Sequence, residues 1–292
     1  MNRRAWTELV VLAALWGAVY PLIEVALRDL SPTVVVFGRV LLACLLLVPI
    51  AIRSSALVDL WRRPRVIIET VLVQSTIPLL LLTYGQRYVS AGIAAILVGA
   101  QPLFVAMLAY RYAPDERPQG WKGTVGISVG LVGLILLFGV DLRGGRLALL
   151  GGALVLIAAL CYAAGAIMIH RRHATAPPLG VATSAMLVTS TVMITPATLT
   201  LPDHTPSPGV LAAVVFLGIV CTGMTLVLFY TLIARTGPAR AALAFYLSPA
   251  FAVTFGVAFL REQLTVASTI GLGAIVAGCL LAAQRTKPPP MS

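Results

Sequence analysis

Gln74, Gln101 and Ser248 are polar residues inside segments that are otherwise apolar over membrane length. Lipid tails offer no hydrogen-bond partner, so such side chains face other helices or a wet cavity. A Gln amide can donate to a carboxylate and accept from an ammonium group. Gln101 and Ser248 each directly precede a proline, and they are 147 positions apart. These residues either join helices by hydrogen bonds or contact a polar solute; we favour solute contact for them.

Four aromatic residues lie deeper in the apolar segments than the belt of Trp and Tyr expected at the membrane surfaces. They are Trp16, Tyr20, Tyr162 and Tyr246. Their N–H and O–H groups need partners that lipid cannot supply. They therefore either pack between helices with local hydrogen bonds or line a solute cavity, and Trp16 is the best candidate for the cavity.

Three prolines, Pro78, Pro102 and Pro249, fall near the middle of apolar segments. A proline inside a helix removes one backbone donor and kinks the helix. The kinks are either static packing features or hinges that shape and gate a site. Pro102 and Pro249 are again 147 positions apart, and this matched pair favours the hinge interpretation.

None of the ten Asp and Glu residues lies near the middle of an apolar segment. Glu24 and Arg39 are the only opposite charges placed within the first two segments, both toward the same membrane face. We expect them to form an ion pair, with an outer gate as the alternative. A proton carrier needs a suitably buried Asp, Glu or His, so we expect transport without obligatory proton exchange.

Enzyme chemistry, metals and cofactors have no support in the sequence. It contains no G-x-x-x-x-G-K-[ST] loop for nucleotide phosphates. The three His residues lie in or beside loops, and we expect His170 and His173 to be solvated rather than metal ligands. The Cys residues all fall inside apolar segments, where they act as small packing residues; they are Cys44, Cys161, Cys221 and Cys279.

Ten apolar segments must position these residues. Hydrophobic residues make up 59% of the 292 positions and charged residues only 11%, against about 25% charged in soluble domains. Each segment is near the ~20 residues that a transmembrane helix needs. The predicted spans are 7–27, 33–52, 67–87, 91–111, 121–140, 148–169, 179–200, 209–234, 238–260 and 266–284. The sequence therefore predicts an all-α membrane protein with a single transmembrane domain over 1–292.

The domain consists of two copies, 7–140 and 148–284. Pro49 and Pro196, Phe104 and Phe251, and Gly126 and Gly273 match without a gap. Five helices per copy is an odd number, so the second copy enters the membrane from the opposite side. Inverted repeats are a transporter architecture with the solute site at the repeat interface.

The net charge of +11 reports topology rather than nucleic-acid binding. Fifteen of the 21 Lys and Arg residues lie at one set of segment ends and five at the other. This asymmetry predicts cytoplasmic N- and C-termini and contact with anionic lipid. We further expect a monomer, in which Gly126-x-x-x-Gly130 packs against Gly273-x-x-x-Ala277 of the same chain.

Several motifs resemble the drug/metabolite transporter superfamily, in particular its EamA-type members. They include Leu15-Trp16-Gly17, Phe37-Gly38-Arg39, Gly99-Ala100-Gln101-Pro102, Leu247-Ser248-Pro249 and the carboxylates Glu116 and Glu262. Within the superfamily the chain looks most like the YddG-type bacterial amino-acid exporters. The resemblance implies ten helices, cytoplasmic termini and a central cavity. Glu116 and Glu262 are not at the same repeat offset, so the resemblance does not establish equal roles for them.

The function expected from these features is alternating-access export of small metabolites across the bacterial inner membrane. Aromatic rings, amides and hydroxyls suit amino acids with aromatic or other apolar side chains. The alternative is another solute class, such as purines, drugs or nucleotide sugars. A lipid-binding or structural membrane protein is disfavoured by the inverted repeat.

Overall fold

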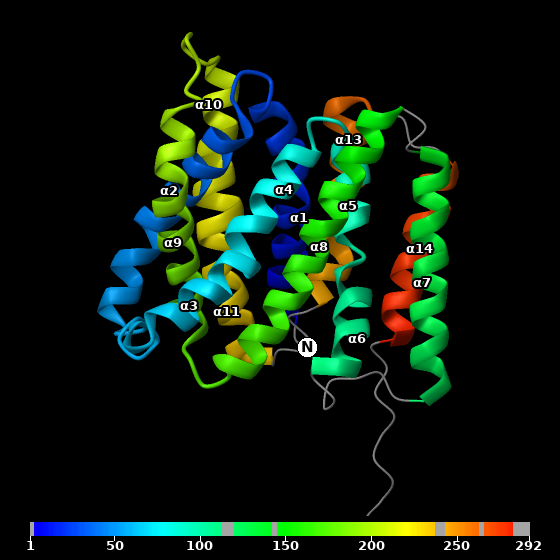
Figure 1. Cartoon of the computed structure of the whole chain (residues 1–292), viewed down its shortest axis with the longest axis horizontal. Helices are drawn as coiled ribbons and strands as arrows, with labels where there is room; N and C mark the ends of the chain where they lie inside the picture. The colour runs from blue at the N-terminus through cyan, green and yellow to red at the C-terminus, as the bar shows by residue number, and fades with distance from the viewer. Residues whose placement is uncertain (1–2, 113–119, 142–144, 237–242, 263–265, 283–292) are drawn as a thin grey trace, which may run out of the picture.

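Every regular element that the structure describes is a helix (Figure 1). The structure is a computed structural model, and it describes residues 3–112, 120–141, 145–236, 243–262 and 266–282. The first copy contains α1 (Arg3–Ala26), α2 (Pro32–Arg53), α3 (Pro64–Val71), η2 (Leu72–Thr76), α4 (Ile77–Gly85), α5 (Ala91–Val98), α6 (Gln101–Tyr112) and α7 (Gly120–Asp141). The second contains α8 (Arg146–Arg172), α9 (Pro178–Thr198), α10 (Pro208–Val215), η3 (Phe216–Met224), α11 (Thr225–Thr236), α13 (Leu243–Leu260) and α14 (Val266–Ala282).

The helices follow the predicted spans closely, with interruptions inside some of them. Within the described ranges, seven helical stretches are long and apolar enough to cross a membrane, and shorter apolar helices accompany them. The predicted span 67–87 is divided into α3, η2 and α4, and the span 91–111 into α5 and α6. The described part of the predicted span 238–260 begins only at Leu243.

Contacts between loops show that the second copy is inverted. Ser31, after α1, is hydrogen-bonded to Thr200, after α9, with 2.8 Å between the hydroxyl oxygens. Asp29 accepts a 2.8 Å bond from the backbone N–H of Ser207 in the same region. Helices α1 and α9 therefore end on the same side of the bundle. Since α8 leads into α9 through a short connection, α8 runs opposite to α1 (Figure 1).

We name the end of the bundle that holds loops 27–31, 86–90 and 199–207 the distal end. The proximal end is the one marked N in Figure 1. The predicted cytoplasmic location of the termini would make the proximal end the inner one; this side assignment stays a prediction.

The packing of the helices repeats with the two copies exchanged. Helix α2 packs on η3, and α9 packs on η2. Likewise α1 packs on α11 and α13, while α8 packs on α4 and α6. Both η2 and η3 are π-helical, and η2 shifted by 147 positions falls inside η3. The internal repeat therefore extends to a backbone irregularity of a kind often found at functional sites.

The distal end is closed by one hydrophobic core that both copies share. Helix α1 contributes Ile23 and α5 contributes Leu97, while α8 and η3 contribute Val155 and Leu217. The proximal half contains separate clusters instead. One joins α1 to α11 and α13, and a smaller one joins α6 to α8. A further cluster joins α2 and α3 to α9. Each cluster contains helices of both copies, so the apolar packing is continuous distally and divided into separate clusters proximally.

Helices α7 and α14 stand together at one side of the bundle (Figure 1) and pack on each other, as predicted. The glycines do not supply this contact in the expected way. A Cβ atom added to Gly130 would overlap Leu103 of α6, and one added to Gly273 would meet no described atom within 4 Å. Close backbone approach occurs instead at Gly17, where a Cβ atom would lie 2.8 Å from the Ser248 carbonyl oxygen of α13.

Candidate substrate site

Arg39 lies inside the bundle, and none of the described residues gives it an acidic partner. It follows Pro32 by seven residues on α2, which places it roughly 10 Å from the helix start at 1.5 Å per residue. Its Nε donates a 2.8 Å hydrogen bond to Oγ1 of Thr222 in η3. The predicted Glu24–Arg39 ion pair is wrong: among the described residues no ion pair joins them, and Glu24 accepts from the Ala91 backbone instead.

Two of the predicted tyrosines lie near this arginine. The guanidinium is close enough to Tyr20 of α1, Tyr162 of α8 and Cys221 of η3 for electrostatic interaction. Tyr20 is buried and Tyr162 is half-buried. Helices α1, α2 and α8 and the segment η3 therefore each place a side chain near the guanidinium. We refer to Tyr20, Arg39, Tyr162 and Thr222 as the Arg39 site.

Trp16 is part of an aromatic cluster one turn from the Arg39 site. Its ring stacks on Phe245 of α13 with 4.5 Å between centroids and tilts against Phe229 of α11 at 5.2 Å. Trp16 and Tyr20 are four residues apart on α1, so they share a helix face. Phe229 and Phe245 were not predicted, because a Phe in an apolar segment carries no sequence signal of its own.

Gln74 occupies the corresponding π-helical segment of the first copy. Its Oε1 atom is buried and has no hydrogen-bond partner among the described residues. A Cβ atom on Gly165 of α8 would lie 2.6 Å from the Gln74 Cα atom, so α8 approaches η2 closely here. Gly165 and Tyr162 are three residues apart and share a helix face. Gln74 therefore packs on the face of α8 that carries Tyr162, and its Oε1 is an unpaired acceptor within the described part of the chain.

The hydroxyl groups beside Gln74 form a contact between α9 and η2 that corresponds to the Arg39–Thr222 contact between α2 and η3, but without a charge. Thr76 bonds Thr189 of α9 at 2.9 Å, and Thr189 donates to Ser75 at 3.4 Å. Ser75 and Thr222 are 147 positions apart, so the α9–η2 contact matches the α2–η3 contact. Pro78 follows at the second position of α4, directly after η2.

The matched prolines have different effects on their helices. Pro102 is the second residue of α6, after a break at Gly99–Ala100, whereas α13 continues through Pro249. A Cβ atom on Gly99 would lie 3.3 Å from Pro249 Cγ, so the break of one copy packs on the proline of the other. Whether either proline acts as a hinge stays a prediction.

The residues that precede these prolines also differ. Gln101 is the half-buried first residue of α6. Ser248 is buried, and its hydroxyl donates a 3.4 Å bond to the Phe245 carbonyl oxygen. That carbonyl lies four residues before Pro249, so it lacks its usual backbone donor. Tyr246 lies on α13, but its side chain is outside the described residues.

Glu24 and Glu262 lie together at the distal end. Both carboxyl groups accept from the backbone N–H of Ala91, the first residue of α5, at 3.1 and 2.7 Å respectively. The sequence singled out Glu262 by its place in the resemblance but did not indicate that it meets Glu24. Glu116 lies outside the described residues.

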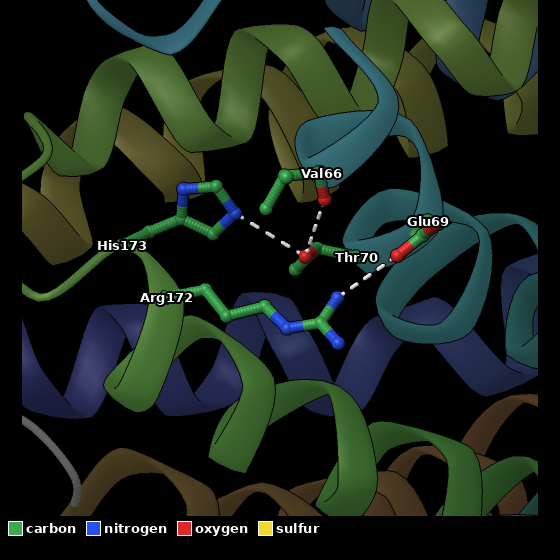
Figure 2. A network of polar contacts seen from close by, with 5 residues as sticks. All are labelled: Val66, Glu69, Thr70, Arg172 and His173. Carbon is green, nitrogen blue, oxygen red and sulfur yellow. Dashed lines mark hydrogen bonds and ion pairs between the residues drawn. The ribbon is translucent and has the colours of Figure 1, made fainter. Parts of the chain in front are cut away.

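His173 is tied into a polar network at the proximal end (Figure 2). Its Nε2 atom lies 3.2 Å from the Thr70 hydroxyl, which donates to the Val66 carbonyl. Arg172 donates a 3.0 Å bond to Glu69 beside it. Partial burial, followed by Arg172, lowers the pKa of His173, and contact with the Val66 backbone opposes this shift. His173 is therefore docked on α3, and the prediction of simple solvation is wrong for it.

Comparison with known proteins identifies the family. The EamA-like transporter family matches residues 6–139 and again 149–284. The transporter YedA of Escherichia coli K12, named as an uncharacterized inner membrane transporter, is 28% identical over 287 residues, covering 94% of this chain and 88% of that protein. The uncharacterized transporter YoaV of Bacillus subtilis is 28% identical over 207 residues, covering 68% of each chain. These names do not support the narrower resemblance to YddG-type exporters.

A solved structure described only as "Crystal structure of protein" has the same fold. Its TM-score is 0.69 at 17% sequence identity, and the match covers 97% of this chain and 98% of the other. The two family matches, the inverted packing and the apolar helices together identify a multi-pass inner-membrane transporter. This chain belongs to the EamA-like transporter family of the drug/metabolite transporter superfamily.

Proposed function

We propose that this transporter exports amino acids with aromatic or other apolar side chains by alternating access. The observation that carries the proposal is Arg39, a cation inside the bundle whose hydrogen-bond partner among the described residues is the neutral Thr222 hydroxyl. A buried cation without a counter-ion is costly, and a substrate carboxylate would supply the missing charge.

The neighbourhood of Arg39 suits the rest of an amino acid. Trp16, Phe229 and Phe245 form an apolar surface for a side chain. The unpaired Oε1 of Gln74 is an acceptor suited to an ammonium group. Trp16 is one helical turn from Tyr20 on α1. Gln74 packs on the face of α8 that carries Tyr162.

The alternative solutes fit these charges less well. A cationic drug would meet the positive charge of Arg39. A nucleotide sugar carries two phosphates and would call for more than one cation, and neutral purines would leave Arg39 without a partner. An amino acid brings a single carboxylate, which Arg39 alone can neutralise.

The state of the bundle fits one half of a transport cycle. The shared core closes the distal end, whereas the proximal half is divided between separate clusters. Alternating access would then move the division from the proximal to the distal end. We further propose that the chain acts as a monomer in the lipid and does no enzyme chemistry.

The test is uptake of radiolabelled phenylalanine into proteoliposomes, with two competing analogues. 3-Phenylpropionate keeps the carboxylate and should compete, whereas phenethylamine lacks it and should not. Arg39→Gln should weaken the affinity for phenylalanine about 10- to 100-fold, the equivalent of roughly 1.5–3 kcal/mol for hydrogen bonds to a charged group. Arg53→Gln, an exposed arginine on the same helix, is the matched control. Equal competition by both analogues would remove the carboxylate from the proposal.

The proposal includes transport down the solute gradient without obligatory proton exchange. Phenylalanine flux should then be driven by its own gradient, and an imposed pH difference alone should not drive accumulation. Uphill uptake powered by that difference, and lost in Glu24→Gln, would show proton coupling instead.

A further inference from the structure

Two carboxyl groups from different copies share one backbone donor at the distal end. The Ala91 N–H donates to Glu262 Oε1 at 2.7 Å and to Glu24 Oε2 at 3.1 Å. The Gly92 N–H donates to the other Glu262 oxygen at 3.0 Å. Glu24 lies in the last turn of α1 in the first copy, and Glu262 follows α13 of the second. Their meeting point is the start of α5.

The backbone on both sides of Glu262 directs this residue toward α5. Arg261 has a positive φ of 58°, which is rare outside glycine. The Glu262 N–H then donates to the Gly256 carbonyl at 3.1 Å, folding the chain back onto α13. A Cβ atom on Gly92 or Gly256 would lie 2.7 or 2.6 Å from Glu262 Oε2. A Cβ atom at either position would therefore displace the carboxyl group from this place.

Two carboxyl groups in this arrangement are more stable when one of them is protonated. Because both carboxyl groups accept from the same Ala91 N–H, Oε2 of Glu24 and Oε1 of Glu262 lie close to each other. An ionised carboxylate has acceptors only, so two carboxyl groups this close either repel each other or share one proton. The shared amide donor cannot replace that proton, because it already serves both acceptors. If both groups were ionised, their repulsion would act directly across the contact between the copies.

The surrounding groups leave the pair open to the distal solution. Glu24 lines a pocket of about 370 Å³ together with Arg28, Gln86, Arg87 and Tyr88. The exposed arginines of this wall form no ion pair within 4 Å of either carboxyl group among the described residues, and neither does Arg261.

We propose that Glu24 and Glu262 together bind one proton when the distal end is closed, and that loss of this proton to the distal solution opens that end. The proton enters and leaves on the same side of the bundle. The pair therefore sets how the balance of closed and open states depends on pH, and it does not carry protons across the membrane. The inference rests on the alternating access of the proposed function and not on the identity of the solute.

The test measures opening of the distal end directly, without solute. Ala26 is fully buried in the distal core and becomes the reporter as Ala26→Cys. The variant is made in a background with the four native cysteines replaced by alanine. Its labelling by a water-soluble maleimide is compared between pH 5.5 and 8.5 in detergent micelles. Division by the rate of Thr205→Cys, in an exposed distal loop, removes the intrinsic pH dependence of thiol reactivity.

The normalised rate should rise with pH by up to about tenfold per pH unit, as expected when opening releases one proton. Glu24→Gln places an amide donor where the proton was, so it should hold the rate at its low value. Glu69→Gln at the proximal end is the control and should keep the pH response. A flat response in the parent protein, or an unchanged slope in Glu24→Gln, would overturn the proposal.

Discussion

Ser248 offers a direct test of whether a predicted site residue has a structural role. Its hydroxyl donates at 3.4 Å to the Phe245 carbonyl, which Pro249 leaves without a backbone donor. Ser248→Ala should therefore destabilise the protein by about 1 kcal/mol, since hydrogen bonds in membrane helices average ~0.6 kcal/mol and an unpaired buried acceptor adds to the loss. In a Pro249→Ala background the new N–H at position 249 can donate to the same carbonyl. There Ser248→Ala should cost close to nothing.

The assay is reversible unfolding by sodium dodecyl sulfate in mixed micelles, followed by circular dichroism. The two single variants and the double variant form a cycle with an expected coupling near 1 kcal/mol. Thr254→Ala is the matched control, because Thr254 donates to the Ala250 carbonyl, which keeps its backbone donor in the same helix. Equal costs of Ser248→Ala in both backgrounds would refute the reasoning. A more than tenfold loss of transport at unchanged stability would instead restore Ser248 as a solute contact.

Further predictions concern the close contacts and the proximal network. Gly165→Ala should destabilise the protein by about 1–3 kcal/mol, because the added Cβ meets the Gln74 backbone and not a flexible side chain; the same unfolding assay measures it. The wild type should lose thermal stability as pH falls below about 6.5, where the unfolded chain takes up a proton that His173 with its lowered pKa does not. His173→Gln should remove this dependence and His170→Gln should not. Trp16→Ala should weaken phenylalanine binding about 2- to 10-fold through loss of aromatic contact, measured by competition, with little effect on alanine.

The helices and the repeat could be predicted because their signals are strong in the sequence. Apolar segments of membrane length are set by the thickness of the bilayer, and the matched prolines revealed the offset of 147. The division of 67–87 by η2 could not be predicted, since a π-helical turn has no residue signature of its own. Its counterpart η3 contains no proline at all.

The partners of the polar residues were predicted less well, and the reason is physical. A helix that is apolar all round gives no periodic indication of which face meets which neighbour. Glu24 and Arg39 were placed at similar depth, yet Glu24 faces α5 and Arg39 faces η3. Depth follows from sequence position, whereas the direction of a side chain follows from packing between copies.

The two copies share a backbone arrangement but place different chemical groups in it, so the two sides of the candidate site differ. Ser75 and Thr222 are equivalent in the repeat, yet Ser75 meets the Thr189 hydroxyl while Thr222 meets the charged Arg39. Gln74, with its unpaired acceptor, is equivalent to Cys221, which lies beside the Arg39 guanidinium. Segment η3 therefore lies beside the hydrogen-bond donors of Arg39, whereas η2 carries the acceptor of Gln74. A zwitterion is complementary to such a pair, its carboxylate toward η3 and its ammonium toward η2. A solute of one charge could satisfy only one of the two segments.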